Sequence, residues 1–221
     1  MLILAAPFCA AALLWAKLPE RVPTHWNIHG QVDGYSGKAF GVLLAPTMNV
    51  LLTLLMVFIP RIDPRLRKVE GEARTSLERT IRMVRYAFSG FMSVLALGLL
   101  AAALGKFRDG VQFTYLINVG TSLLIIIIGN FMTKLRPNYL IGIRTPWTLA
   151  SKEVWTRTHR LGGPLMVGGG FLMLVASLLV PLEQYVLWVL LPVIGVISLV
   201  PITYSFWLYR KLEGTPGAST H

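Results

Sequence analysis

Charged residues are scarce in this sequence, and cysteine is almost absent from it. Asp, Glu, Lys and Arg together make up 14% of the 221 residues, whereas hydrophobic residues make up 54% and the mean hydropathy is +0.62. Soluble domains carry about 25% charged residues, so this chain has too few to cover a surface that faces water. The single cysteine, Cys9, excludes an internal disulfide and a cysteine-based metal site, and we expect its thiol to be a small packing group.

Acidic residues are fewer still. The chain has 10 Asp and Glu against 21 Lys and Arg, a net charge of +11. The basic residues lie in short segments between apolar runs, a placement that indicates membrane topology and contact with anionic lipid at the cytoplasmic face. We therefore expect membrane lipids as partners and no direct binding of nucleic acid.

Long apolar runs dominate what is present. A helix that crosses a bilayer needs about 20 apolar residues, because no water is available there to satisfy the backbone. Six runs approach that length: residues 2–16, 40–59, 86–104, 113–132, 165–182 and 186–208. The first is short and could instead be the apolar part of a signal peptide, but no basic residues precede it. The sequence predicts an all-α, polytopic membrane bundle of about six transmembrane helices, with residues 1–221 forming a single membrane domain.

The basic residues also orient the predicted bundle. Most of them fall in residues 60–85, in residues 133–164 and after the last run. The opposite side has only five: Lys17, Arg21, Lys38, Lys106 and Arg108. The positive-inside rule then predicts cytoplasmic loops at 60–85 and 133–164, cytoplasmic termini, and an outer loop at residues 17–39.

Few polar residues lie within the runs. Asn49, Asn118 and Asn130 are the deepest, and no charged residue lies at the centre of a run. This pattern argues against a proton relay or a charge-paired transport path. A small-solute transporter with the three asparagines lining a path stays open as an alternative.

The outer segment from Leu18 to Phe40 contains prolines, glycines and an Asp-Gly pair. These residues predict an ordered excursion that is neither a helix nor a strand pair. His25, His29 and Asp33 are spaced four apart, which leaves open a metal site and a membrane enzyme at the outer face. In the alternative interpretation, aromatic residues lie at the headgroup level and the histidines bond to the backbone.

The inner segment from Pro137 to Pro164 is predicted to contain a short helix. Ser151 can cap a helix from Lys152 to Leu161, and the Gly162-Gly163 pair can end it. Pro164 then suits the first turn of the next span.

One stripe of this helix carries Trp155, Thr158, His159 and Gly162, while Arg157 and Arg160 project elsewhere. The pattern is typical of an interfacial helix on the inner leaflet. Arg144, Arg157 and Arg160 with His159 could equally form a cationic dock for an acidic partner or a phosphate group. The sequence has no Walker loop, HExxH motif or Ser-His-Asp order, so we expect no cofactor and no catalytic residue.

Both segments resemble a known family. The inner one reads Ile141-Gly142-Ile143-Arg144-Thr145-Pro146-Trp147-Thr148-Leu149, followed by Glu153-Val154-Trp155 and His159-Arg160, and it resembles the SdpI family, named for an immunity protein against a sporulation-delaying peptide toxin of bacteria. The outer one resembles a domain of unknown function that often accompanies the first spans of this family; it reads Leu18-Pro19, Val22-Pro23, His25-Trp26-Asn27, Gly30, Asp33-Gly34-Tyr35 and Lys38.

The resemblance implies a bacterial cell-membrane protein that protects against a membrane-active peptide toxin and recruits a small helix-turn-helix repressor. Its candidate residues for binding the toxin or another partner are Arg144, Thr145, Pro146, Trp147, Trp155, His159 and Arg160. Its candidate outer-motif residues are His25, Trp26, Asn27, His29, Asp33 and Tyr35.

Overall fold

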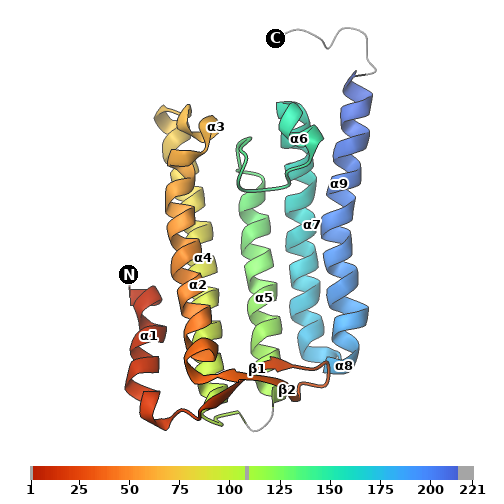
Figure 1. Cartoon of the computed structure of the whole chain (residues 1–221). Helices are drawn as coiled ribbons and strands as arrows, with labels where there is room; N and C mark the ends of the chain where they lie inside the picture. The colour runs from red at the N-terminus through yellow and green to blue at the C-terminus, as the bar shows by residue number, and fades with distance from the viewer. Residues whose placement is uncertain (1, 108–109, 214–221) are drawn as a thin grey trace.

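The computed structural model describes residues 2–107 and 110–213, and Arg108 lies outside them. Long helices run side by side through the molecule (Figure 1). They are α2 (Lys38–Ile62), α4 (Gly71–Ala103), α5 (Gly110–Met132), α7 (Lys152–Leu179) and α9 (Leu191–Glu213), the last preceded by α8 (Leu182–Tyr185) and a π-helical turn, Val186–Leu190. Among the described residues, five segments are long and apolar enough to cross a membrane. The prediction of a polytopic helical membrane bundle is confirmed.

The remaining predicted span, residues 2–16, is a shorter apolar helix, α1 (Leu2–Leu14). Its 13 residues rise about 20 Å, against about 30 Å for a bilayer core. It begins part-way along the bundle and runs toward the end where strands β1 and β2 lie (Figure 1). Cys9 on this helix is exposed, so our expectation of a packing role for its thiol is wrong.

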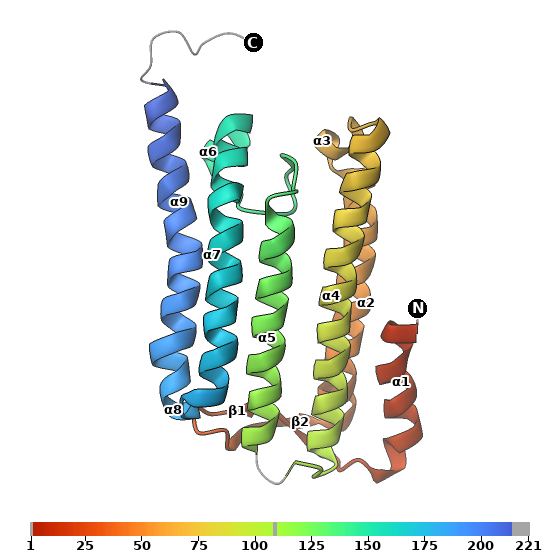
Figure 2. The ribbon, with the colours of Figure 1, turned by 180° about the vertical axis from the view of Figure 1, so that it is seen from behind.

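The helices form two groups, as Figure 2 shows from behind. We call α1, α2 and α4 the first lobe and α5, α7 and α9 the second lobe. Contacts between α4 and α5 join them, and α5 with α7 is the most extensive helix pair. The end with β1 and β2 is the hairpin end; the opposite end, where α3 and α6 lie, is the basic end (Figure 1).

Polar side chains hold the first lobe together. Asn49 Nδ2 on α2 donates hydrogen bonds to the Ser89 carbonyl (3.1 Å) and to Ser93 Oγ (3.0 Å) on α4, and the hydroxyls of Thr53 and Ser89 lie 2.6 Å apart. Without water, such bonds between helices satisfy groups that lipid cannot. The amide of Asn49 is thus used in packing, while Asn130 is exposed, so the transporter alternative gains no support from these two residues.

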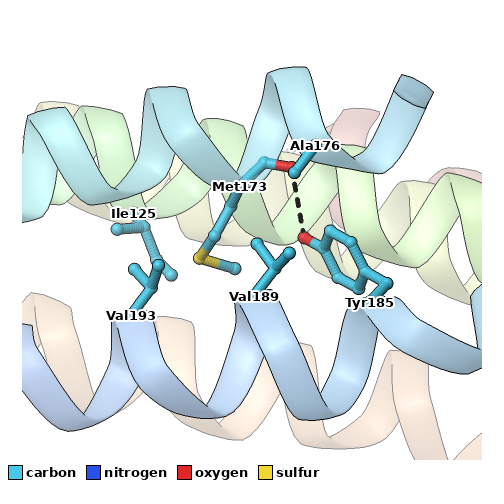
Figure 3. Packing of buried hydrophobic residues seen from close by; sticks show 6 residues of the cluster. All are labelled: Ile125, Met173, Ala176, Tyr185, Val189 and Val193. Atoms are coloured by element: carbon cyan, nitrogen blue, oxygen red, sulfur yellow. Dashed lines mark hydrogen bonds between the residues drawn. The ribbon is translucent and has the colours of Figure 1, made fainter. Parts of the chain in front are cut away.

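Apolar packing fills the second lobe (Figure 3). Its largest cluster joins α5, α7 and the last membrane segment through Ile125, Met173, Ala176, Tyr185, Val189 and Val193. The hydroxyl of Tyr185 donates a hydrogen bond to the Met173 carbonyl at 3.3 Å, which satisfies the one polar atom that this ring buries.

Glycines let α5 and α7 approach closely. A Cβ atom on Gly129 would lie 2.9 Å from the Gly163 carbonyl oxygen and 2.7 Å from Met166 Cβ. The prediction that Gly162 and Gly163 end a short helix is therefore wrong: α7 runs through both of them and through Pro164. Packing against α5 outweighs the roughly 1 kcal/mol that each glycine costs a helix.

The outer segment forms an antiparallel strand pair, β1 (Arg21–Trp26) and β2 (Val32–Gly37), which our prediction of an irregular excursion had excluded. Asn27 builds the turn, because its side-chain oxygen accepts hydrogen bonds from the backbone N–H groups of His29 and Gln31. Gly30 supplies the positive φ of 74°. Register irregularities next to Pro23 and His25 accommodate the residues that sequence rules treat as strand breakers.

The predicted cytoplasmic loop at 60–85 is also largely helical. It holds the end of α2, the one-turn helix α3 (Pro64–Arg67) and the first half of α4. The hydropathy of a sequence indicates where an apolar run ends but not where the helix that contains it ends. The polar first turns of α4 are helical, and an ion pair between Arg74 and Glu78, one turn apart, stabilises them. At 33 residues, about 50 Å, it exceeds the length that a bilayer requires.

We predict that Gly129→Ala lowers the free energy of unfolding by about 1–3 kcal/mol, because the added methyl group forces α5 and α7 apart. Thermal unfolding of the detergent-solubilised protein measures the change. Gly168→Ala is the matched control, since a Cβ atom there meets nothing within 4 Å. Equal stability of the two variants would show that the close approach is dispensable.

Candidate functional site

The basic end is organised by a buried carboxylate. Asp63, 2% exposed, caps α3: its Oδ1 accepts hydrogen bonds from the backbone N–H groups of Arg65 (2.8 Å) and Leu66 (3.2 Å). Its Oδ2 accepts one from the backbone N–H of Tyr139 at 2.6 Å. Hydrogen bonds to a charged acceptor are among the stronger ones in proteins, so Asp63 fixes the first lobe to the segment that leads to α6.

Arg65 makes a second link between the lobes. Its guanidinium donates a hydrogen bond to the Leu149 carbonyl at 2.9 Å and lies over the ring of Tyr139, 4.3 Å from its centroid. Asn138, 1% exposed, then shapes the loop between α5 and α6. The side-chain nitrogen of Asn138 donates hydrogen bonds to the carbonyls of Arg136 and Ile141. Its side-chain oxygen accepts hydrogen bonds from the backbone N–H groups of Leu140 and Ile141.

The short helix α6 (Pro146–Ala150) is capped at its N-terminus and packs against α9. Thr145 and Thr148 form a reciprocal capping box, in which each side chain accepts from the other residue's backbone N–H. The hydroxyl of Thr145 lies 3.0 Å from that of Ser205 on α9, and the rings of Trp147 and Phe206 lie 5.0 Å apart. These contacts hold α6 against α9.

His159 fastens the same segment to α7. Its Nε2 accepts a hydrogen bond from the backbone N–H of Ile143 at 3.0 Å, and its Nδ1 lies 2.8 Å from the Trp155 carbonyl. This pairing assigns the neutral imidazole with its proton on Nδ1. Gly142, with φ of 111°, passes so close that a Cβ atom would lie 2.5 Å from Nε2. Only glycine fits there without strain.

The candidate residues of the inner segment thus fall into two sets. Thr145, Trp155 and His159 are buried and act within the protein, with Trp155 also donating from Nε1 to the Leu135 carbonyl at 2.9 Å. Arg144, Pro146 and Arg160 are exposed, and Trp147 is half-buried.

The predicted interfacial helix is therefore wrong. Its aromatic stripe packs against the protein instead of lipid, because residues 152–161 are the first turns of α7 and meet the loop that precedes α6. Arg157 is exposed and pairs with Glu153 at 2.6 Å.

Sequence reasoning missed Asp63, Arg65 and Asn138. Asp63 directly precedes Pro64, and an Asp-Pro pair is a recognisable signal for a helix start. No comparable signal links Arg65 to Leu149, since 84 residues separate them and only the folded chain brings them together.

At the hairpin end, the structure separates the three proposed metal ligands. His25 Nδ1 lies 2.5 Å from Asp33 Oδ1 across the strand pair, while His29 faces Glu183 of α8 at 3.2 Å. Across residues 2–107 and 110–213, no group of three or more His, Cys, Asp and Glu side chains is arranged to hold a metal. The metal hypothesis based on the four-residue spacing is not supported.

The hairpin spans both lobes. Trp26 packs on Phe113 of α5, with ring centroids 4.5 Å apart, and Gly30 lies against Val111 and Leu182. Asn27 forms the turn, whereas Tyr35 is 54% exposed. Figure 1 shows the strand pair running across the helix ends from the first lobe to α8. The outer motif is therefore both a brace and an exposed surface.

These features define a class: a multi-pass helical membrane protein with a hairpin across one end of the bundle and an ordered basic segment at the other. Residues 134–205 match the SdpI/YfhL protein family, and residues 2–50 match a domain of unknown function, DUF1648. Over residues 134–205 the chain is therefore similar to the SdpI/YfhL family.

A curated relative extends this similarity along the chain. The Immunity protein SdpI of Bacillus subtilis (strain 168) is 24% identical over 217 residues, which cover 97% of this chain and 96% of the relative. No solved structure matches. The SdpI/YfhL match covers the loop, α6, α7 and most of α9, so the inner candidates, including the buried ones, all lie within it.

We predict that Asp63→Asn lowers the free energy of unfolding by about 1–3 kcal/mol, because an amide nitrogen would then face a backbone N–H donor. Trypsin cleavage after exposed Arg144 in the same loop should also accelerate, since the Tyr139 tether is lost. Glu72→Gln, an exposed carboxylate in the first turn of α4, is the control and should change stability by less than about 0.5 kcal/mol. Unchanged cleavage in Asp63→Asn would contradict the bracing role.

Proposed function

We propose that this protein is an immunity protein, which protects the bacterium that carries it from a membrane-active peptide toxin. The observation that carries the proposal is the similarity to an immunity protein across nearly the full length of both chains. A match of this extent includes both ends of the bundle, so it is consistent with a shared arrangement of outer hairpin, spans and inner segment.

The hairpin end supplies the surface that a peptide arriving from outside would meet first. Ile28 and Tyr35 are exposed there by 49% and 54%, beside the exposed His25–Asp33 pair. An amphipathic peptide binds through apolar and aromatic side chains, with polar groups that fix its orientation. In this proposal the hairpin binds the toxin, and contacts through Trp26 and His29 connect the occupied hairpin to both α5 and α8.

Recruitment of a small helix-turn-helix repressor is a second candidate function. Exposed Arg144 is held in place by a hydrogen bond to the Tyr139 carbonyl, next to the α6 surface that presents Pro146 and half-buried Trp147. A preorganised arginine beside an aromatic ring is a favourable contact for an acidic protein surface. Trp155 and His159 would act indirectly, by positioning this surface.

Contact with anionic lipid at the same end is also part of the proposal. Arg157 and Arg160 are exposed on the first turns of α7, where they would lie near the phosphates of the inner leaflet. An outer-face enzyme would need a metal or catalytic group beyond the His25–Asp33 pair, so we favour the binding protein over the enzyme.

We expect toxin-sensitive bacteria that express the wild-type protein to survive a challenge with a panel of membrane-active peptides. Tyr35→Ala and His25→Ala should raise sensitivity by roughly tenfold, the effect of losing about 1.4 kcal/mol of binding free energy. Arg79→Ala, an exposed residue of α4 away from both segments, is the control and should protect as the wild type does.

Arg144→Ala separates the two candidate functions. Protection retained by this variant, together with loss of a toxin-induced transcriptional response, would assign Arg144 to recruitment. Failure of the wild-type protein to protect against any peptide, at a membrane abundance equal to that of an active relative, would refute the immunity proposal.

A further inference from the structure

A cavity of about 590 Å³ lies at the basic end, between the two lobes. Arg65 and Val69 line it from the first lobe. The second lobe contributes the chain that leaves α5, the end of α6 and the first turns of α7, through residues such as Lys134, Arg136 and Lys152. Its volume falls within the range of about 300–1,000 Å³ that small-molecule sites occupy.

The lining is strongly basic. Four cationic side chains contribute to it, Arg65, Lys134, Arg136 and Lys152, and no Asp or Glu side chain does. Asp63, near Arg65, accepts three backbone hydrogen bonds, and Glu153, next to Lys152, pairs with Arg157. Glu70, which follows Val69, is exposed and does not line the cavity. Within the described ranges, Lys134, Arg136 and Lys152 have no carboxylate partner.

Cations that line one open cavity repel each other, and an anion removes that repulsion. Lys134, Arg136 and Lys152 are exposed, so water and salt screen part of it. α7 adds to the attraction, since Lys152 is its first residue and Thr156 lies one turn further on; the positive end of the helix dipole is therefore at the cavity. Arg65 is fixed by its bond to the Leu149 carbonyl, so part of the site is preorganised.

The depth of the cavity points to the headgroup region. Lys134 follows the last residue of α5, Met132, by two positions, and Lys152 opens a helix whose later turns are apolar enough to cross the bilayer. Lysine and arginine at such positions lie at the level of lipid phosphates. We propose that this cavity is a binding site for a phosphate group, carried either by an anionic lipid headgroup or by a soluble phosphate compound.

A phosphate bound in this cavity would add a further link between the two lobes. A phosphate between Arg65 on one side and Arg136 and Lys152 on the other would bond to both lobes at once. A ligand that binds only the folded protein raises its melting temperature. This inference concerns a ligand of the basic end and does not depend on the immunity proposal.

The test uses the purified full-length protein in a non-ionic detergent. Affinity and melting temperature are measured with inorganic phosphate, with short-chain phosphatidylglycerol, with short-chain phosphatidylcholine as the zwitterionic control, and with an acidic peptide. We expect phosphatidylglycerol or inorganic phosphate to bind and to raise the melting temperature. Binding of phosphatidylglycerol alone identifies a lipid site, and binding of both identifies a site for phosphate in general.

Variants locate the binding. Arg136→Gln and Lys152→Gln should each weaken it by about tenfold and reduce the melting-temperature shift, because each removes one charge-assisted hydrogen bond. Lys152→Arg should retain affinity, which separates loss of charge from loss of structure. Arg79→Gln, the same change of charge on an exposed part of α4, should alter affinity by less than about twofold.

Three results would overturn the proposal. The first is the absence of any phosphate binding. The second is binding that Arg79→Gln weakens as much as Arg136→Gln does, since this would indicate general attraction to a basic surface. The third is binding of the acidic peptide alone with the expected variant pattern, which would make the cavity a protein-docking site.

Discussion

Backbone hydrogen bonding in a medium without water constrains the whole of this structure. Within the bilayer, each long helix satisfies its own N–H and carbonyl groups, as a span must. Where the chain leaves the helices, side chains take over that task. Asn27 does so in the hairpin turn, Asp63 and Asn138 at the basic end, and His159 at Ile143. The irregular segments are therefore ordered at both ends of the bundle.

The two lobes meet through the spans where α4 packs on α5, and further contacts join them at both ends of the bundle. The hairpin connects them at one end through Trp26 and His29, while Asp63 and Arg65 connect them at the other. This arrangement gives the proposed functions a physical route between the two membrane faces. A ligand that changes the contact at one end acts on elements that extend to the other, although a relay additionally requires two states of the bundle.

The candidate residues acquired different roles once the fold was known. Arg144 and Trp155 lie in the same recognisable motif, yet one is exposed and the other is 1% exposed. Periodicity correctly placed Trp155, Thr158 and His159 on one helix face but could not tell whether lipid or protein covers it, because both are apolar. The matched segment therefore includes residues that fix the loop as well as residues available to a partner.

The sequence by itself determined the membrane class, the approximate position of the spans and the separation of basic and hairpin ends, because hydropathy and charge placement are local properties set by the bilayer. It also contained the family resemblance. Only the tertiary structure decided that residues 21–26 and 32–37 form a strand pair, that α7 continues through Gly162 and Gly163, and that Arg65 shares a cavity with Arg136 and Lys152. Each of these depends on contacts between residues distant in sequence, whose packing energies override local propensity.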